Sequence, residues 1–171
     1  VTALGGTHIA DTWFADLGFG NSVKYSGVSV LSHPTLAATS RTILRGNRFD
    51  RLVSVSVVGL AAPEIEANQF FDMERNALLV SRSEHAEIAG NLFSGPSPTN
   101  AVRIVHGSDN ARLVGNVILE GARAGFLVSD GSDNVLIDGN LIWRRNGGGV
   151  KLNNVRCGIV QNNLILDDKQ K

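Results

Sequence analysis

Five charged or titratable residues of this chain are the strongest candidates for chemistry: Arg82, Arg103, His106, Asp130 and Lys151. Three of them are cationic, which suits a polyanionic chain, because each guanidinium or ammonium group can pair with one anionic group of the polymer. His106 is a candidate general base, since imidazole titrates near neutral pH. These residue types predict a surface for an anionic ligand, provided that the fold brings the five side chains together.

Ordinary surface chemistry also accounts for most of this set. Arg103 and Lys151 stand at outward positions of expected strands, where charge is common. His106 and Asp130 each precede a glycine, and turn formation alone explains an aspartate at such a position. Both interpretations of these four residues therefore stay open at the level of sequence.

We expect no metal and no other cofactor. His8, His33 and His85 are not spaced as metal ligands, and the segment "DGSD" at 130–133 lacks the further acidic ligands of a calcium loop. The single cysteine, Cys157, can form neither an internal disulfide nor a cysteine-based zinc site.

Composition excludes several classes of protein. The 171 residues are 43% hydrophobic and 19% charged, which is typical of a folded chain, and the net charge of zero argues against a dedicated nucleic-acid binder. No run of about 18 apolar residues is present, so we expect no membrane insertion. Because the chain starts at Val1 without an initiator Met, we expect one domain over residues 1–171 that is a piece of a longer protein.

A repeated step must position the candidate residues. A small residue, an asparagine, one variable residue and then an apolar residue recur in "RGNRF", "AGNLF", "VGNVI" and "DGNLI". The asparagines are Asn47, Asn68, Asn91, Asn116, Asn140 and Asn163, spaced 21, 23, 25, 24 and 23 residues apart. A period of this size indicates a solenoid.

A second short run follows most of these asparagines by nine or ten residues and alternates with period two. In "AVRIVH", Val102 and Ile104 would point one way and Arg103 the other, as in a strand; Leu127 and Lys151 would share the side of Arg103. No window holds a helical stripe of three turns. Each repeat is therefore predicted to consist of two or three short strands joined by turns rich in Gly, Asn, Asp and Ser.

The pattern favours an all-β, right-handed parallel β-helix of about seven coils, with about 23 residues per coil. A leucine-rich repeat would need leucines at fixed offsets, whereas these units use Val, Ile, Phe and Leu interchangeably. In stacked coils the asparagine amides can hydrogen-bond to one another along the axis, which explains a polar residue in an apolar run. Thr12 is expected to occupy the same step in an earlier coil, with an insertion near "SHPTLAATS" before Asn47.

The segments "HIADTWFADLGFGNSVKYSGVSV", "LRGNRFD", "LLVSRSEHAEIAGN" and "SDGSDNVLIDGN" together resemble the β-helix of the periplasmic mannuronan C5-epimerases, which edit alginate. This resemblance implies that Arg82, in "VSR", neutralises a substrate carboxylate. The Asp-Pro-His-Asp signature that carries the family's catalytic base is replaced here by "VGLA", Val58 to Ala61. His106 is the nearest substitute base, so Arg82 and His106 are the catalytic candidates, and Arg103, Asp130 and Lys151 the substrate-binding ones.

Two functions follow as expectations. The first is a periplasmic or extracellular protein that acts on an acidic, uronate-containing polysaccharide as an epimerase or lyase. The second is a noncatalytic structural or carbohydrate-binding module of a larger extracytoplasmic protein. Exposed strand edges at the ends of such a solenoid also predict end-to-end association.

Overall fold

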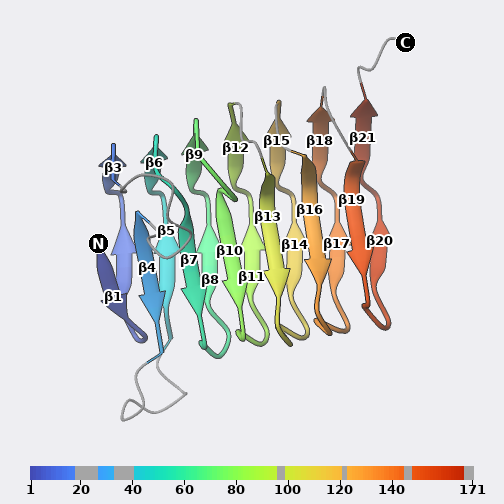
Figure 1. Ribbon diagram of the computed structural model, residues 1–171, viewed down its shortest axis with the longest axis horizontal. Helices are drawn as coiled ribbons and strands as arrows, with labels where there is room; N and C mark the ends of the chain where they lie inside the picture. Colours follow the sequence, from blue (N-terminus) through green and yellow to red (C-terminus); the bar gives the residue numbers. More distant parts are fainter. Residues whose placement is uncertain (18–26, 33–40, 96–98, 121–122, 145–147, 168–171) are drawn as a thin grey trace.

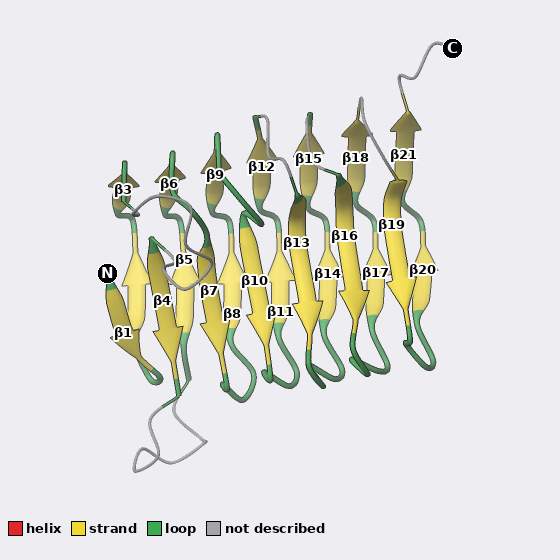
Figure 2. Cartoon of the chain, viewed as in Figure 1, coloured by secondary structure: helices red, strands yellow, loops and turns green. Residues whose placement is uncertain are grey.

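The computed structural model describes residues 1–171 except 18–26, 33–40, 96–98, 121–122, 145–147 and 168–171. Short strands and turns, without a helix, make up the described residues (Figure 2). Each coil gives one strand to each of three seven-stranded parallel sheets, and successive coils stack along the long axis (Figure 1). The predicted all-β parallel β-helix is confirmed. Among the described residues, no helix has the length and apolar character needed to cross a membrane.

The three sheets take every third strand in chain order. Sheet A contains β1 (Thr2–Leu4), β4 (Val28–Leu31), β7 (Val55–Val58), β10 (Leu78–Ser81), β13 (Asn100–Val105), β16 (Ala124–Ser129) and β19 (Gly148–Asn153). Sheet B contains β2 (His8–Ala10), β5 (Ile43–Arg45), β8 (Glu64–Glu66), β11 (Glu87–Ala89), β14 (Arg112–Val114), β17 (Leu136–Asp138) and β20 (Ile159–Gln161). Sheet C contains β3 (Trp13–Ala15), β6 (Arg48–Asp50), β9 (Gln69–Phe71), β12 (Leu92–Ser94), β15 (Val117–Leu119), β18 (Leu141–Arg144) and β21 (Leu164–Asp167).

The core is a set of columns in which the middle residue of each strand points inward and packs on its counterpart in the next coil. In sheet C, Phe14, Phe49, Phe70 and Phe93 stack with ring centroids 5.3, 5.0 and 4.6 Å apart. Full burial of one such side chain contributes about 1.5 to 3 kcal/mol to stability. The apolar alternation in the sequence therefore becomes a continuous core along the axis.

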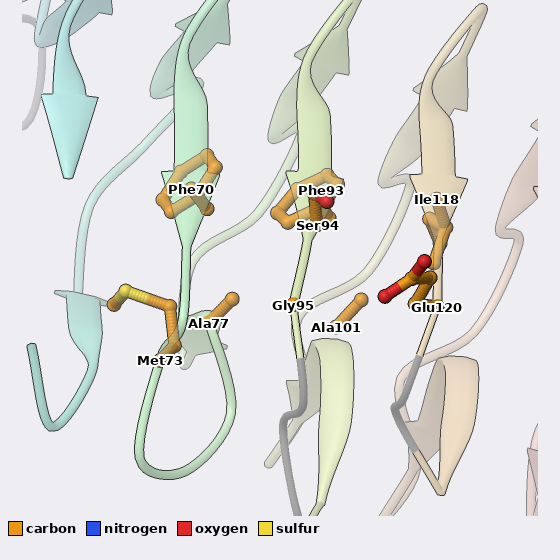
Figure 3. Close-up of a pocket in the computed structure, with 9 residues that line it drawn as sticks. All are labelled: Phe70, Met73, Ala77, Phe93, Ser94, Gly95, Ala101, Ile118 and Glu120. Atoms are coloured by element: carbon orange, nitrogen blue, oxygen red, sulfur yellow. The ribbon is translucent and has the colours of Figure 1, made fainter. Parts of the chain in front are cut away.

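A small cavity marks the point where this column changes from phenylalanine to isoleucine (Figure 3). It has a volume of about 10 Å³ and lies beside Phe93 and Ile118, with Ala101 on β13 and Ala77 just before β10. A space of this size holds at most about one water molecule. The cavity is therefore a packing gap and not a ligand site.

The predicted asparagine column is present and runs through the interior. The Nδ2 group of each ladder asparagine donates to Oδ1 of the next asparagine, at 3.0, 3.1, 3.0, 3.0 and 2.8 Å from Asn47 to Asn163. Each backbone N–H donates to the same Oδ1, so every step joins two coils twice. Thr12 occupies the first step, because its N–H donates to Asn47 Oδ1 at 3.1 Å. The insertion expected before Asn47 lies outside the described residues, apart from Ser32.

A second ladder follows the strands of sheet A and consists of serines. Ser83, Ser108 and Ser132 are fully buried, and the backbone N–H groups of Leu60, Ser83 and Ser108 donate to the serine hydroxyl one coil further on, at 3.1 to 3.2 Å. Ser108 Oγ also donates to Val105 O at 2.7 Å. Both polar turns of the coil are thus fixed by side chains that satisfy buried backbone groups.

The coil that contains β19, β20 and β21 exposes apolar side chains that would be interior in a middle coil. Val160 is 44% exposed and Ile165 is 43% exposed, whereas their counterparts Ile137 and Ile142 are fully buried. An exposed coil interior is compatible with stacking of a further coil. End-to-end association stays a prediction.

Acid is expected to loosen the turn between the last two coils. The Arg156 backbone N–H, 2.8 Å from Asp133 Oδ1, and the Arg156 guanidinium lower the pKa of the Asp133 carboxyl. A group with a lowered folded pKa stabilises the fold above its unfolded pKa of about 3.9, and this contribution is lost as pH falls through the folded value. The difference in unfolding free energy between wild type and Asp133→Asn should therefore shrink below about pH 4. A difference that stays constant down to acid pH in urea titrations would contradict this.

Candidate functional site

A basic groove crosses the start of strands β10, β13, β16 and β19, which lie side by side in Figure 1. Its volume is about 520 Å³. Its lining includes four cationic residues, Arg75, Arg103, Arg123 and Lys151, and the described residues that line it include no Asp or Glu. The remaining lining residues are Asn76, Thr99, Asn100, Ala124, Leu127 and Gly148.

The groove follows from three rows of equivalent positions. One row holds Arg103, Leu127 and Lys151, which are direct strand partners and point outward. The other strand residues of the groove form a middle row of mostly small side chains, in which Asn100 pairs with Ala124 and Ala124 with Gly148. The groove is the space left above this middle row, because its small side chains lie between two rows that contain the long cationic side chains.

The third row lies just before the strands and holds Arg75, Thr99 and Arg123. The backbone N–H of Arg123 donates to Thr99 O, which places Arg123 one coil beyond Thr99. In the middle row, Asn100 Nδ2 donates to Asn76 Oδ1 at 2.9 Å, which fixes the two amides across the same coils. The groove therefore carries positive charge on both sides of a neutral, polar middle row.

Two polar atoms of the groove residues lack an internal partner. Thr99 Oγ1 and Arg103 Nε are buried and make no hydrogen bond in the described part of the chain. Buried polar groups without partners are rare in folded proteins, and they frequently mark a place where a ligand or water binds. Both atoms belong to the groove lining.

The other three candidate residues lie beyond the opposite end of the same strands. Arg82, His106 and Asp130 occupy equivalent turn positions with φ of 51°, 58° and 58°, and Gly59 and Asn154 continue this column. Positive φ is the left-handed region, which the turn imposes on whichever residue stands there. The recurrence of aspartate, asparagine and glycine in this column thus follows from backbone geometry.

His106 and Asp130 each have a polar partner in this turn column. Ser81 Oγ lies 3.0 Å from His106 Nδ1, so the imidazole is held by a hydroxyl from the preceding coil. Ser129 Oγ donates to Asp130 Oδ2 at 3.2 Å, and Arg103 Nη2 lies 3.9 Å from the same oxygen. The Arg103–Asp130 ion pair is the contact between the groove and the turn column.

The five candidate residues therefore form two neighbouring groups. Arg103 and Lys151 line the basic groove, whereas Arg82, His106 and Asp130 lie in the turn column. His106 follows Arg103 by three residues, about 10 Å along an extended chain. A ligand that fills the groove thus meets Arg103 and Lys151 first.

The "VGLA" segment lies one coil before Arg82. Val58 pairs with Ser81, and Gly59 stands beside Arg82 in the turn column, with its N–H bonded to Ser81 O. Leu60 is buried, and Ala61 forms an isolated bridge with Glu84. Because none of these four side chains can accept or donate a proton, this segment supplies no acid or base. In the described residues, no three His, Cys, Asp or Glu side chains gather as metal ligands would.

The groove residues that precede the strands were not predicted from the sequence. Arg75, Thr99 and Arg123 stand 24 residues apart, as do Asn76, Asn100 and Ala124. This spacing equals the coil period, so alignment of the residues immediately before each alternating run would have revealed the two additional rows.

Three parallel sheets, two polar ladders and a groove built from equivalent coil positions define this chain as a parallel β-helix protein. Residues 53–171 match the family described as "Right handed beta helix region", and the chain belongs to that family. No curated protein and no solved structure matches the chain.

Proposed function

We propose that this chain is an extracytoplasmic β-helix module, periplasmic or extracellular, that binds an acidic, uronate-containing polysaccharide in the basic groove. The observation that best supports this proposal is the lining of the groove, which has four cationic residues and no acidic one among the described residues. Guanidinium groups are well suited to carboxylates, because they can donate two parallel hydrogen bonds. The net charge of zero means that this positive surface is local.

The neutral residues of the groove favour a sugar over a small anion. Asn76, Thr99 and Asn100 offer amide and hydroxyl groups to sugar hydroxyls, and Leu127 offers an apolar contact. Each of four successive coils contributes one of the four cations, and the coils are about 4.8 Å apart, so a polymer lying along the axis meets one cationic side chain per coil. The groove therefore suits a repeating polyanion better than a single ligand.

Catalysis is the second candidate function, and the Ser81–His106 contact favours it. Epimerisation or elimination of a uronate needs neutralisation of the carboxylate, a base for the C5 proton and a proton donor on the ring or the leaving oxygen. Arg82, as the resemblance to mannuronan C5-epimerases implies, is available for the first task, and His106 is the substitute base available for the second. We place binding first, because Val58 to Ala61 offer no acid or base and the turn column lies beyond the groove.

Titration calorimetry with defined oligouronates tests this proposal. We expect binding that tightens with oligomer length and weakens with added salt, and no binding of the carboxyl-reduced neutral oligomer, because the groove recognises charge. Equal binding of the neutral oligomer, or no binding of any uronate, would overturn the proposal.

Solvent deuterium exchange at C5 of bound oligouronate separates the two functions. A binding module leaves C5 unlabelled, and this is the expected result. Labelling that disappears in the His106→Ala variant would establish catalysis in place of binding alone.

A further inference from the structure

The outer surface of sheet C is apolar over its C-terminal half. Outward positions of β12, β15, β18 and β21 form this apolar face, which contains Leu92, Val117, Leu119, Leu141, Trp143 and Leu164. Trp143 is 50% exposed and Leu164 is 56% exposed. Contiguous apolar patches on a soluble surface usually mark an interaction site.

Sheet B shows that the fold does not require such a surface. Six of its fourteen outward positions are charged, and some of them pair across coils, as in Arg45 with Glu66 at 2.7 Å and Arg112 with Glu87 at 3.0 Å. Both sheets bury one face in the same core, so their outer faces have the same structural demands. The apolar face of sheet C therefore needs a separate explanation.

The chemistry of the apolar face indicates which kind of partner it can bind. Ser94 is the one polar side chain among the outward positions of β12, β15 and the first three residues of β18. The backbone N–H and C=O groups of these strands are used in pairing with the strands of neighbouring coils. A glycan or an extended peptide would find few hydrogen bonds there. A second flat, apolar sheet surface can cover it without leaving polar groups unpaired.

We propose that the apolar face is a contact between two copies of this chain, whose solenoid axes run in opposite directions. A two-fold axis along β15 places β15 over its counterpart and β12 over β18 of the second copy. Ser94 then faces Trp143 of the second copy, so the smallest side chain of the face meets the largest. Leu92 faces Leu141, and no charge opposes another at these positions.

A two-fold axis along the solenoid fits less well. It would place β18 over β18 and bring Trp143 against Leu141, two large side chains, while Ser94 would meet Leu92. Size complementarity thus selects the antiparallel pair. The apolar face takes in four strands of sheet C, β12, β15, β18 and β21, so at a spacing of about 4.8 Å it is about 14 Å long. This is smaller than a standard interface, so the dimer is reversible and depends on concentration.

Sedimentation velocity over the micromolar range tests the contact. Wild type should shift from monomer to dimer and stop there. Leu119→Glu should weaken the dimer at least tenfold, because it sets two carboxylates against each other at the axis. The control is Val114→Glu, the same kind of change at an outward position of sheet B in the same coil, and it should leave the dimer constant unchanged. Circular dichroism melts check that both variants fold.

Cysteine cross-linking tests the orientation with milder changes. In a Cys157→Ser background, Leu119→Cys should form a disulfide-linked dimer, and Ser94→Cys should cross-link to Trp143→Cys but not to itself. A wild type that stays monomeric, an association that Leu119→Glu does not weaken, or growth beyond dimers would overturn the proposal. Growth beyond dimers is the result that end-to-end stacking would give.

Discussion

Replacement of Asn116 by alanine is expected to lower the free energy of unfolding by about 2 to 4 kcal/mol. Asn116 is fully buried in the middle of the asparagine ladder. Its Oδ1 accepts from the backbone N–H and the Nδ2 of Asn91, both at 3.0 Å, and its Nδ2 donates to Ile88 O at 2.8 Å. Alanine leaves these groups of the preceding coil without partners, and each unsatisfied buried group costs about 1 to 3 kcal/mol.

Asn163→Ala is the matched control for this change. Asn163 makes the same contacts toward Asn140, at 2.9 and 2.8 Å, but it is half-buried in the last described coil, so water can replace its amide. We expect a cost below about 1 kcal/mol for the control. Urea unfolding followed by circular dichroism measures both variants. Equal effects at the two positions would show that the ladder contributes through the local turn and not through burial.

Charge reversal at Arg103 should weaken oligouronate binding by about 10- to 100-fold, since a hydrogen bond to a charged group contributes about 1.5 to 3 kcal/mol. Arg103 is 39% exposed at its side chain and belongs to a row with Lys151 in the groove. Arg103→Glu replaces a donor by a charge of the same sign as the ligand. The loss should be largest at low salt, where repulsion is least screened.

Arg112→Glu is the control for Arg103→Glu. Arg112 stands in the same coil and also points outward, but it lies on sheet B and pairs with Glu87. Both variants change the net charge equally, so a general effect of charge would weaken binding in both. Calorimetry with one oligouronate should show a loss for Arg103→Glu alone. Similar losses in the two variants would mean that the polymer binds through overall charge and not in the groove.

The fold could be predicted because one residue type, asparagine, recurs in the sequence with the period of the coil. An asparagine inside an apolar run has few uses other than a ladder, so its spacing identified the coil and its register. The serine ladder was not predicted, because serine is common in turns, and Ser83, Ser108 and Ser132 are separated by 25 and 24 residues without an apolar run around them. Only the backbone N–H groups that they satisfy reveal their role.

The candidate site was predictable where strand alternation applies. Arg103 and Lys151 follow from period two, and both line the groove. Arg75 and Arg123 precede the strands, where no alternation rule fixes the direction of a side chain. Arg82 and His106 were placed with Arg103 because adjacent coils of a β-helix lie close together. The left-handed turn separates them, and positive φ at Arg or His has no reliable signature in a single sequence.

The rows of the basic groove have a consequence for how this protein can change over evolutionary time. Every row takes one residue from each coil, so duplication of one 24-residue unit such as 100–123 would add one more set of contacts and extend the groove by about 4.8 Å. The existing contacts would keep their geometry, because each coil bonds only to its two neighbours. Under the proposed function, the number of coils sets the length of polymer that the groove can contact, and duplication of a coil would change this length without a change in the chemistry of the existing contacts.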